Sequence, residues 1–187
     1  MLHNNMKKYL TLFFSITITI SIITGCKAKK VEKITDAEKV AIEYTISKNN
    51  PFYYVTLEKT NQLLKEEGIL YIGYPESDAA KQIVMILTEL SKTEKLSIAY
   101  YNPKQSTKNK ENDALAQTLD QEQVLVPGLY FIKAGKIISK DTSLAFEPID
   151  YFTKEMKQEL TKKYQKMIKD YQEMAKSEPF FLPKLLS

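Results

Sequence analysis

The chain has one cysteine, one histidine and no tryptophan among its 187 residues, and it has no arginine. The histidine is His3 and the cysteine is Cys26, both near the start of the chain. If the segment before Cys26 is removed, the mature chain keeps no imidazole and cannot form an internal disulfide. These absences exclude a Ser-His-Asp or Cys-His nucleophile system and a Cys/His zinc site. Catalysis by Asp, Glu or Lys side chains is not excluded by these absences.

The chain also has only a small excess of positive over negative charge. The basic residues are all lysines, 27 against 23 acidic residues, for a formal net charge of +4. If Lys7 and Lys8 leave with a leader, the charge falls to +2. Such a small excess is more typical of a soluble surface than of a nucleic-acid-binding surface. Without arginine, the chain also has no side chain that forms paired hydrogen bonds to guanine or to phosphate. We therefore expect no nucleic-acid partner, no metal and no cofactor.

What is present is enough apolar material for a packed core. Hydrophobic residues make up 43% of the chain and charged residues 27%, with five glycines and seven prolines. This composition is typical of a globular protein, and the length suggests one domain with extensions.

Residues 1–25 have the pattern of an export signal peptide. Lys7 and Lys8 form a basic start, and an apolar stretch follows from Leu10 to Ile23. That stretch is shorter than the ~20 residues that a membrane-spanning helix needs. We therefore expect the segment to be cleaved rather than to remain as an anchor.

The signal ends in Ile23-Thr24-Gly25-Cys26, which resembles the lipobox of bacterial lipoproteins. In that family the cysteine thiol receives diacylglycerol, and the cysteine becomes the first residue of the mature chain. Several acyl chains together anchor a protein stably where one would not. The resemblance implies lipidation at Cys26, a short basic tether over residues 26–33, and attachment to the extracytoplasmic face of the cell membrane. The alternative is an uncleaved anchor with an incidental cysteine.

Hydrophobic periodicity predicts an α/β domain over residues 34–178. The run Ile69–Ile72 is continuously apolar and lies between glycines, which is typical of a strand buried on both faces in a parallel sheet. The other predicted strands cover residues 52–57, 96–101, 129–133 and 136–139. The predicted helices cover residues 35–48, 58–67, 79–90, 113–119 and 152–174. Residues 179–187 form an apolar tail, which either folds back over the domain or docks onto a membrane partner.

Two segments within this order resemble thioredoxin. The stretch from Tyr71 to Lys81 is similar to the strand, aromatic-proline turn and helix start that carry the Cys-x-x-Cys motif. The stretch from Val126 to Lys136 is similar to the cis-proline segment that faces this motif. A third segment, the strand end Tyr100-Tyr101-Asn102, is also found in the thioredoxin-like group of bacteriocin transport accessory proteins. The chain resembles this group more closely than it resembles thioredoxin itself, over roughly residues 51–172. The resemblance implies a central mixed sheet flanked by helices, here with an extra N-terminal helix and a long C-terminal helix.

The motif itself departs from the family. Ser77 and Ala80 stand at the two cysteine positions. Thiol-disulfide exchange needs a thiolate that attacks a disulfide and a second thiol that resolves the mixed disulfide, so we expect no redox activity. Ser77 as a substitute nucleophile lacks a histidine base, with only Asp78 or Glu76 as conceivable partners. We therefore favour the interpretation that Ser77 caps the following helix.

The resemblance also implies a peptide groove, which we place at Tyr74, Pro75, Glu76, Ser77, Val126 and Pro127. In the family the proline is cis and exposes backbone groups that pair with an extended chain. The alternative for Pro127 is an ordinary trans proline that begins a strand.

These patterns lead to three hypotheses of function. The first is a redox-inactive module that binds an exported peptide or a membrane export protein, and it implies an accessory role at the cell surface. The second is an enzyme, either an oxidoreductase that uses the thiols of a partner or a hydrolase built on Asp or Glu. The third is a purely structural surface lipoprotein.

Overall fold

The computed structural model describes residues 34–106, 109–146 and 152–177. The chain divides into two units, Met1–Lys33 and Ile34–Ser187. The predicted leader, the lipidated Cys26, the tether and the apolar tail at 179–187 all lie outside the described residues. The fold below is that of the second unit.

A five-stranded mixed sheet forms the centre of this unit, in the order β1-β3-β2-β4-β5. The first three strands in this order are parallel, β4 is antiparallel to β2, and β5 is antiparallel to β4. The strands are β1 (Phe52–Tyr54), β2 (Gly68–Ile72), β3 (Ile98–Tyr101), β4 (Gly128–Lys133) and β5 (Lys136–Asp141). This arrangement confirms the predicted thioredoxin-like α/β class with a central mixed sheet.

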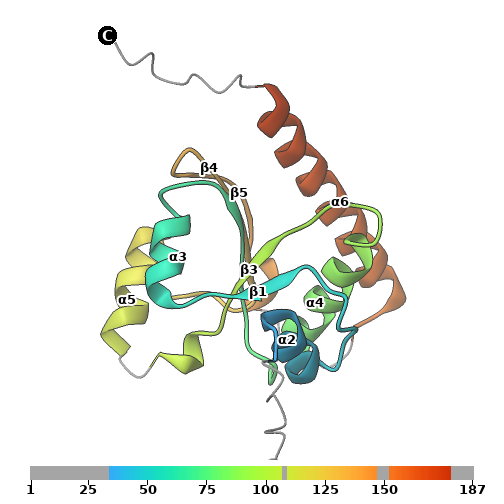
Figure 1. The fold of residues 1–187 in the computed structure, drawn as a ribbon, viewed down its shortest axis with the longest axis horizontal. Coiled ribbons are helices and arrows are strands. Elements are labelled where there is room, and N and C mark those ends of the chain that lie inside the picture. Colours follow the sequence, from blue (N-terminus) through green and yellow to red (C-terminus); the bar gives the residue numbers. More distant parts are fainter. Residues whose placement is uncertain (1–33, 107–108, 147–151, 178–187) are drawn as a thin grey trace, which may run out of the picture. The chain divides into compact units, whose positions relative to one another are not determined.

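Helices cover both faces of the sheet (Figure 1). One face is covered by α3 (Leu57–Leu63) and α5 (Asn109–Thr118), and the other by α2 (Asp36–Tyr44), α4 (Asp78–Leu90) and α6 (Lys154–Ser177). Two short 3-10 turns, η1 (Pro103–Gln105) and η2 (Ser143–Ala145), complete the described elements. The predicted N-terminal helix and long C-terminal helix are both present.

Strand β2 shows why the core has two halves. Ile69 and Tyr71 pack on the side of α4 and α6, whereas Leu70 and Ile72 pack on the side of α3 and α5. Successive side chains of a strand point to opposite faces, so an apolar run of this kind requires cover on both sides. The prediction of a strand buried on both faces is confirmed.

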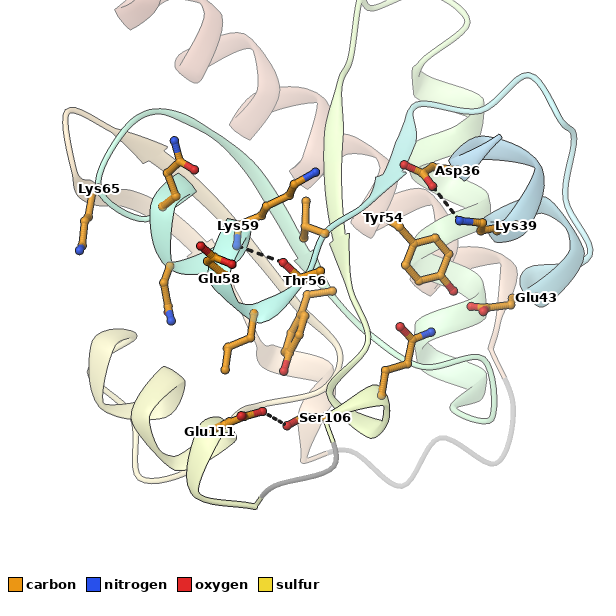
Figure 2. Close-up of a pocket in the computed structure, with 16 residues that line it drawn as sticks. Asp36, Lys39, Glu43, Tyr54, Thr56, Glu58, Lys59, Lys65, Ser106 and Glu111 are labelled. Carbon is orange, nitrogen blue, oxygen red and sulfur yellow. Dashed lines mark hydrogen bonds and ion pairs between the residues drawn. The ribbon is translucent and has the colours of Figure 1, made fainter. Parts of the chain in front are cut away.

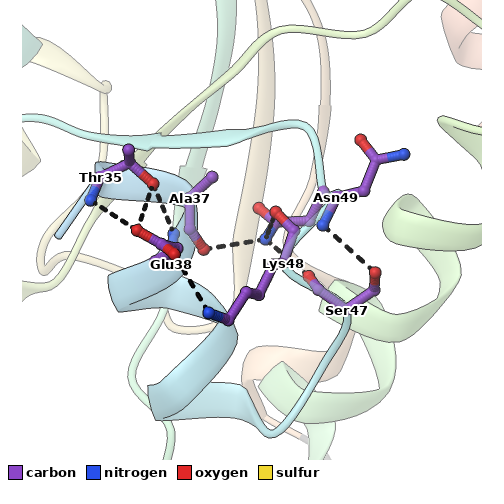
Figure 3. A network of polar contacts seen from close by, with 7 residues as sticks. Thr35, Ala37, Glu38, Ser47, Lys48 and Asn49 are labelled. Atoms are coloured by element: carbon purple, nitrogen blue, oxygen red, sulfur yellow. Dashed lines mark hydrogen bonds and ion pairs between the residues drawn. The ribbon is translucent and has the colours of Figure 1, made fainter.

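Helix α2 begins with a capping box (Figure 3). The side chain of Thr35 accepts a hydrogen bond from the backbone N–H of Glu38, and the Glu38 carboxylate accepts one from the backbone N–H of Thr35. The helix ends at Tyr44 rather than near Lys48, because Thr45 takes a left-handed conformation (φ 55°) and turns the chain back. Lys48 then pairs with Glu38 at 3.1 Å.

Other predicted boundaries are wrong by a few residues. The first strand ends at Tyr54 rather than Leu57, because the Thr56 side chain caps α3. Helix α3 ends at Leu63, since the next backbone N–H groups form tighter turn bonds. Strand β3 begins at Ile98, and α5 begins at Asn109 rather than Asp113. At the end of β1 and the end of α3, local capping and turn hydrogen bonds decide where the element stops.

Helix α6 packs an apolar stripe on the sheet. Leu160, Tyr164 and Ile168 are buried, and Tyr171 is partly buried with its ring centroid 5.6 Å from that of Phe131 on β4. Met174, at the end of the stripe, is 44% exposed. Among the described helices, none has the length and apolarity of a membrane span.

Candidate functional site

The register of β2 and β4 brings the two predicted site segments together. Ile72, the last residue of β2, pairs with Gly128, the first residue of β4. The segment that follows Ile72 and the segment that precedes Gly128 therefore leave the sheet at the same edge. These segments are Tyr74–Ser77 and Val126–Pro127. The Val126–Pro127 peptide bond is cis, as the resemblance implied.

Ser77 is the N-cap of α4. Its hydroxyl oxygen accepts a hydrogen bond from the backbone N–H of Ala80 at 3.2 Å. Asp78 lies in the first turn, where a carboxylate is favoured by the positive end of the helix dipole. The predicted capping role of Ser77 is confirmed, and its oxygen is engaged with the backbone.

Ala80, at the second cysteine position, is fully buried. Its carbonyl accepts a hydrogen bond from the Tyr71 hydroxyl at 3.0 Å. Tyr71 is itself fully buried, and burial raises the pKa of its hydroxyl well above the ordinary value. The group beneath the motif is therefore a neutral phenol that supports the helix start.

A lysine from outside the predicted motif lies at its entrance. The Lys104 ammonium on η1 is 3.3 Å from Glu76 Oε2 and 4.2 Å from the centre of the Tyr74 ring. The pKa of Glu76 is lowered, first by a hydrogen bond from its own backbone N–H and then by Lys104, which together outweigh slight desolvation. Lys104 thus forms an ion pair with Glu76 and a cation–π contact with the Tyr74 ring.

A groove of about 350 Å³ lies beside these segments. Of the six predicted site residues, Tyr74 and Val126 line it. Ser77 turns to the helix, Glu76 is exposed toward Lys104, and Pro127 is buried. The rest of the lining comes from Pro103, Asn112, Asp113, Gln123, Val124, Leu125 and Ala145.

Hydrogen bonds fix one wall of this groove. The Asn112 side chain accepts a hydrogen bond from the Tyr101 hydroxyl at 2.9 Å and donates one to the Pro103 carbonyl at 3.1 Å. Val126 also lines the groove, and its backbone N–H and C=O make no hydrogen bond to any other described residue.

Sequence reasoning missed Lys104, Asn112 and Asp113. Each lies in the polar, lysine-rich stretch between β3 and β4, where the hydrophobic pattern is weakest. The one available signal was their position after a strand, since residues beyond the carboxyl ends of parallel strands gather at one edge of a sheet.

A second hollow, of about 1210 Å³, lies near β1 between α2, α3 and the segment that leads into α5 (Figure 2). Several of its polar side chains bind one another: Asp36 with Lys39 at 3.1 Å, and the Ser106 hydroxyl with Glu111 at 2.7 Å. Acidic and basic residues alternate around it, so its lining favours no single ligand charge. The sequence contained no signal for this hollow.

Two buried tyrosines, Tyr44 and Tyr100, belong to the core on the side of α2, α4 and α6. Tyr44 and Tyr100 join their hydroxyls at 3.3 Å, and the Tyr100 hydroxyl donates to Glu43 at the same distance. Burial is the largest cause that raises the pKa of both phenols above the ordinary value. These tyrosines therefore stay protonated near neutral pH and stabilise the packing rather than transfer protons.

The described residues contain no group of three or more His, Cys, Asp or Glu side chains placed to hold a metal ion.

No protein-family model matches the chain, and no curated protein matches it. Solved structures similar to it include thioredoxin O2 from Arabidopsis thaliana in the oxidized state, with 13% identity and a TM-score of 0.44 over 65% of this chain and 94% of that one. Another comes from work on the thiol resolving mechanism in yeast mitochondrial 1-Cys peroxiredoxin via glutathione/thioredoxin systems. It has 16% identity and a TM-score of 0.41 over 63% of this chain and 92% of that one. Nothing about the activity of this chain follows from these values.

Proposed function

We propose that this chain is a lipid-anchored, extracytoplasmic thioredoxin-like protein that binds an extended peptide segment and has no thiol-disulfide activity of its own. The observation that carries the proposal is the groove beside Tyr74 and Val126. Its apolar side chains lie beside a residue, Val126, whose backbone makes no hydrogen bond to another residue that the structure describes.

The absence of sulfur supports the second half of the proposal. Thiol-disulfide exchange requires a thiolate at the first cysteine position of the motif and a resolving thiol at the second. Ser77 stands at the first position with its oxygen bonded to the helix, and the buried Ala80 stands at the second. The lone Cys26 lies far along the sequence from both, and we assign it to lipid attachment with diacylglycerol and acyl chains.

The groove supports the first half. Pro103, Ala145 and Val124 to Val126 supply apolar walls, and Tyr74 supplies a ring. An extended peptide offers alternating side chains for such walls and backbone groups for the N–H and C=O of Val126, the pairing used in strand addition. The family resemblance adds the context of an accessory to peptide or bacteriocin export, with an exported peptide or a membrane export protein as partner.

Peptide binding by the full chain, kept in detergent micelles, tests the proposal. Fluorescence anisotropy with labelled, end-capped hexapeptides rich in Ala, Leu and Ser should show saturable binding. Tyr74→Ala and Val126→Asp should weaken it, because they remove a ring and charge an apolar wall. Met85→Ala removes a 45% exposed apolar side chain from α4, outside the groove, and serves as the matched control. Failure of the wild-type chain to bind, or equal binding by the groove variants, contradicts the proposal.

Insulin reduction in the presence of dithiothreitol tests the redox half and the rival hypothesis of an oxidoreductase. The wild-type chain should match the protein-free blank. Thiol-dependent turnover above the blank would overturn the proposal.

A further inference from the structure

Among the described residues that line the groove beside Tyr74, Asp113 on α5 is the one that carries a carboxylate or an ammonium group. The other described lining residues are apolar, amide or, in Tyr74, phenolic. Asp113 is exposed, and within the described ranges its carboxylate has no hydrogen bond and no ion pair. An unpaired charge on a groove wall discriminates between ligands of opposite sign.

No cation described nearby is paired with Asp113. Lys104 is the cation at the groove entrance, and its ammonium is engaged with Glu76 at 3.3 Å and with the Tyr74 ring at 4.2 Å. Lys110, three residues before Asp113 on α5, is exposed and forms no ion pair with it. Asp113 is therefore the formal charge that the described lining presents to a ligand.

We infer that the groove selects peptides in which a lysine or arginine accompanies an apolar side chain. This inference rests on the proposed function and specifies the ligand of the same site. The apolar side chain lies against Val124, Val126 and Ala145, and the cation pairs with Asp113. In an extended chain, alternate side chains point the same way, so an apolar residue and a cation two positions apart face the groove together.

Three end-capped hexapeptides provide the probes: acetyl-Ala-Leu-Ser-Lys-Ser-Ala-amide and its variants with Gln or Glu in place of Lys. Capping removes the terminal charges, so the peptides differ in one side chain. The wild-type chain should bind the lysine peptide about three-fold more tightly than the glutamine peptide, in line with an exposed ion pair, and added salt should remove the difference. The glutamate peptide should bind least.

Substitutions at Asp113 assign the preference to this residue. Asp113→Asn should abolish the preference for the lysine peptide over the glutamine peptide, and Asp113→Lys should shift the preference to the glutamate peptide. Asp170→Asn is the matched control, because it neutralises an exposed carboxylate on α6, on the other face of the sheet.

The two proposals fail in different ways. If all three peptides bind wild type equally, or if Asp113→Asn keeps the preference for lysine, the charge selection is wrong and peptide binding stands. If none of the peptides binds the wild-type chain, the peptide-binding function itself fails, and the selection fails with it.

Discussion

The ammonium of Lys163 on α6 lies 2.8 Å from Oδ1 of Asp141, the last residue of β5. The Asp141 side chain is 3% exposed, whereas that of Lys163 is 44% exposed. Asp141 also accepts hydrogen bonds from the backbone N–H and the hydroxyl of Ser143, at 3.1 and 2.8 Å. Three donors thus hold a buried carboxylate where the edge strand meets the long helix.

Asp141→Asn should lower the free energy of unfolding by about 1–3 kcal/mol, because it removes a charged acceptor from a buried hydrogen-bonded site. Urea unfolding of the full chain measures the change. Glu173→Gln is the control, since its partner Lys169 is 3.8 Å away and both side chains are more than half exposed. That substitution should cost less than about 1 kcal/mol, and equal losses in the two variants would contradict the assignment.

Stability should fall at acidic pH through the same carboxylate. Burial by itself raises the pKa of Asp141, but hydrogen bonds from Lys163 and Ser143 outweigh it and hold the pKa below the ordinary value. A group with a depressed folded pKa stabilises the fold above its unfolded pKa, about 3.9, and loses this contribution as the pH falls through the folded pKa. The stability difference between wild type and Asp141→Asn should therefore shrink below about pH 4. A constant difference down to pH 2–3 would count against it.

Ser77→Ala should destabilise the domain by about 1 kcal/mol, because the N-cap bond to the Ala80 backbone is lost. Ser77→Asp, which keeps a capping oxygen, should retain most of the stability. Thermal or urea unfolding provides the measurement. If Ser77→Ala is as stable as wild type yet loses peptide binding, Ser77 acts on the ligand rather than on the helix.

Placing cysteines at positions 77 and 80 should confer thiol-disulfide activity. In Ser77→Cys with Ala80→Cys, the first thiol lies at the N-terminus of α4, where the helix dipole lowers the pKa of a thiol, and the second lies in the buried position. Insulin reduction should rise above the blank in the double variant and stay at the blank in either single variant. An inactive double variant that still folds would contradict the prediction that two thiols at these positions suffice.

Cys26→Ser should release the chain from lipid attachment, since a hydroxyl does not replace the thiol as acceptor of diacylglycerol. Fractionation of cells that express the two forms, with mass spectrometry of the mature N-terminus, measures the change. Wild type should carry acyl mass on Cys26 and the variant should not. An unmodified Cys26 in the mature wild-type chain would contradict the prediction.

Much of the fold follows from local patterns. The apolar run Ile69–Ile72 and the stripe on α6 each report the burial of their own element, and the Thr35 and Ser77 caps report helix starts. The end of α2 at Tyr44 was missed, because a left-handed Thr45 carries no compositional signal.

Only part of the candidate site could be predicted from the sequence, because some of its residues carry no local signal. Tyr74 and Val126 were found because each sits in a segment with a recognisable turn or proline. Asp113 and Ala145 enter the same groove from α5 and η2, and no spacing in the sequence relates them to Tyr74.

The amino-acid sequence alone determined which side chains stand at positions 77 and 80, because a serine and an alanine carry no sulfur in any conformation. Only the tertiary structure decided which polar groups share the groove. The pairing of Ile72 with Gly128 brings the two segments to one edge, and the packing of α5 on the sheet places Asp113 beside them. Side chains distant in sequence become neighbours through strand register and helix packing, and these depend on the burial of the whole core.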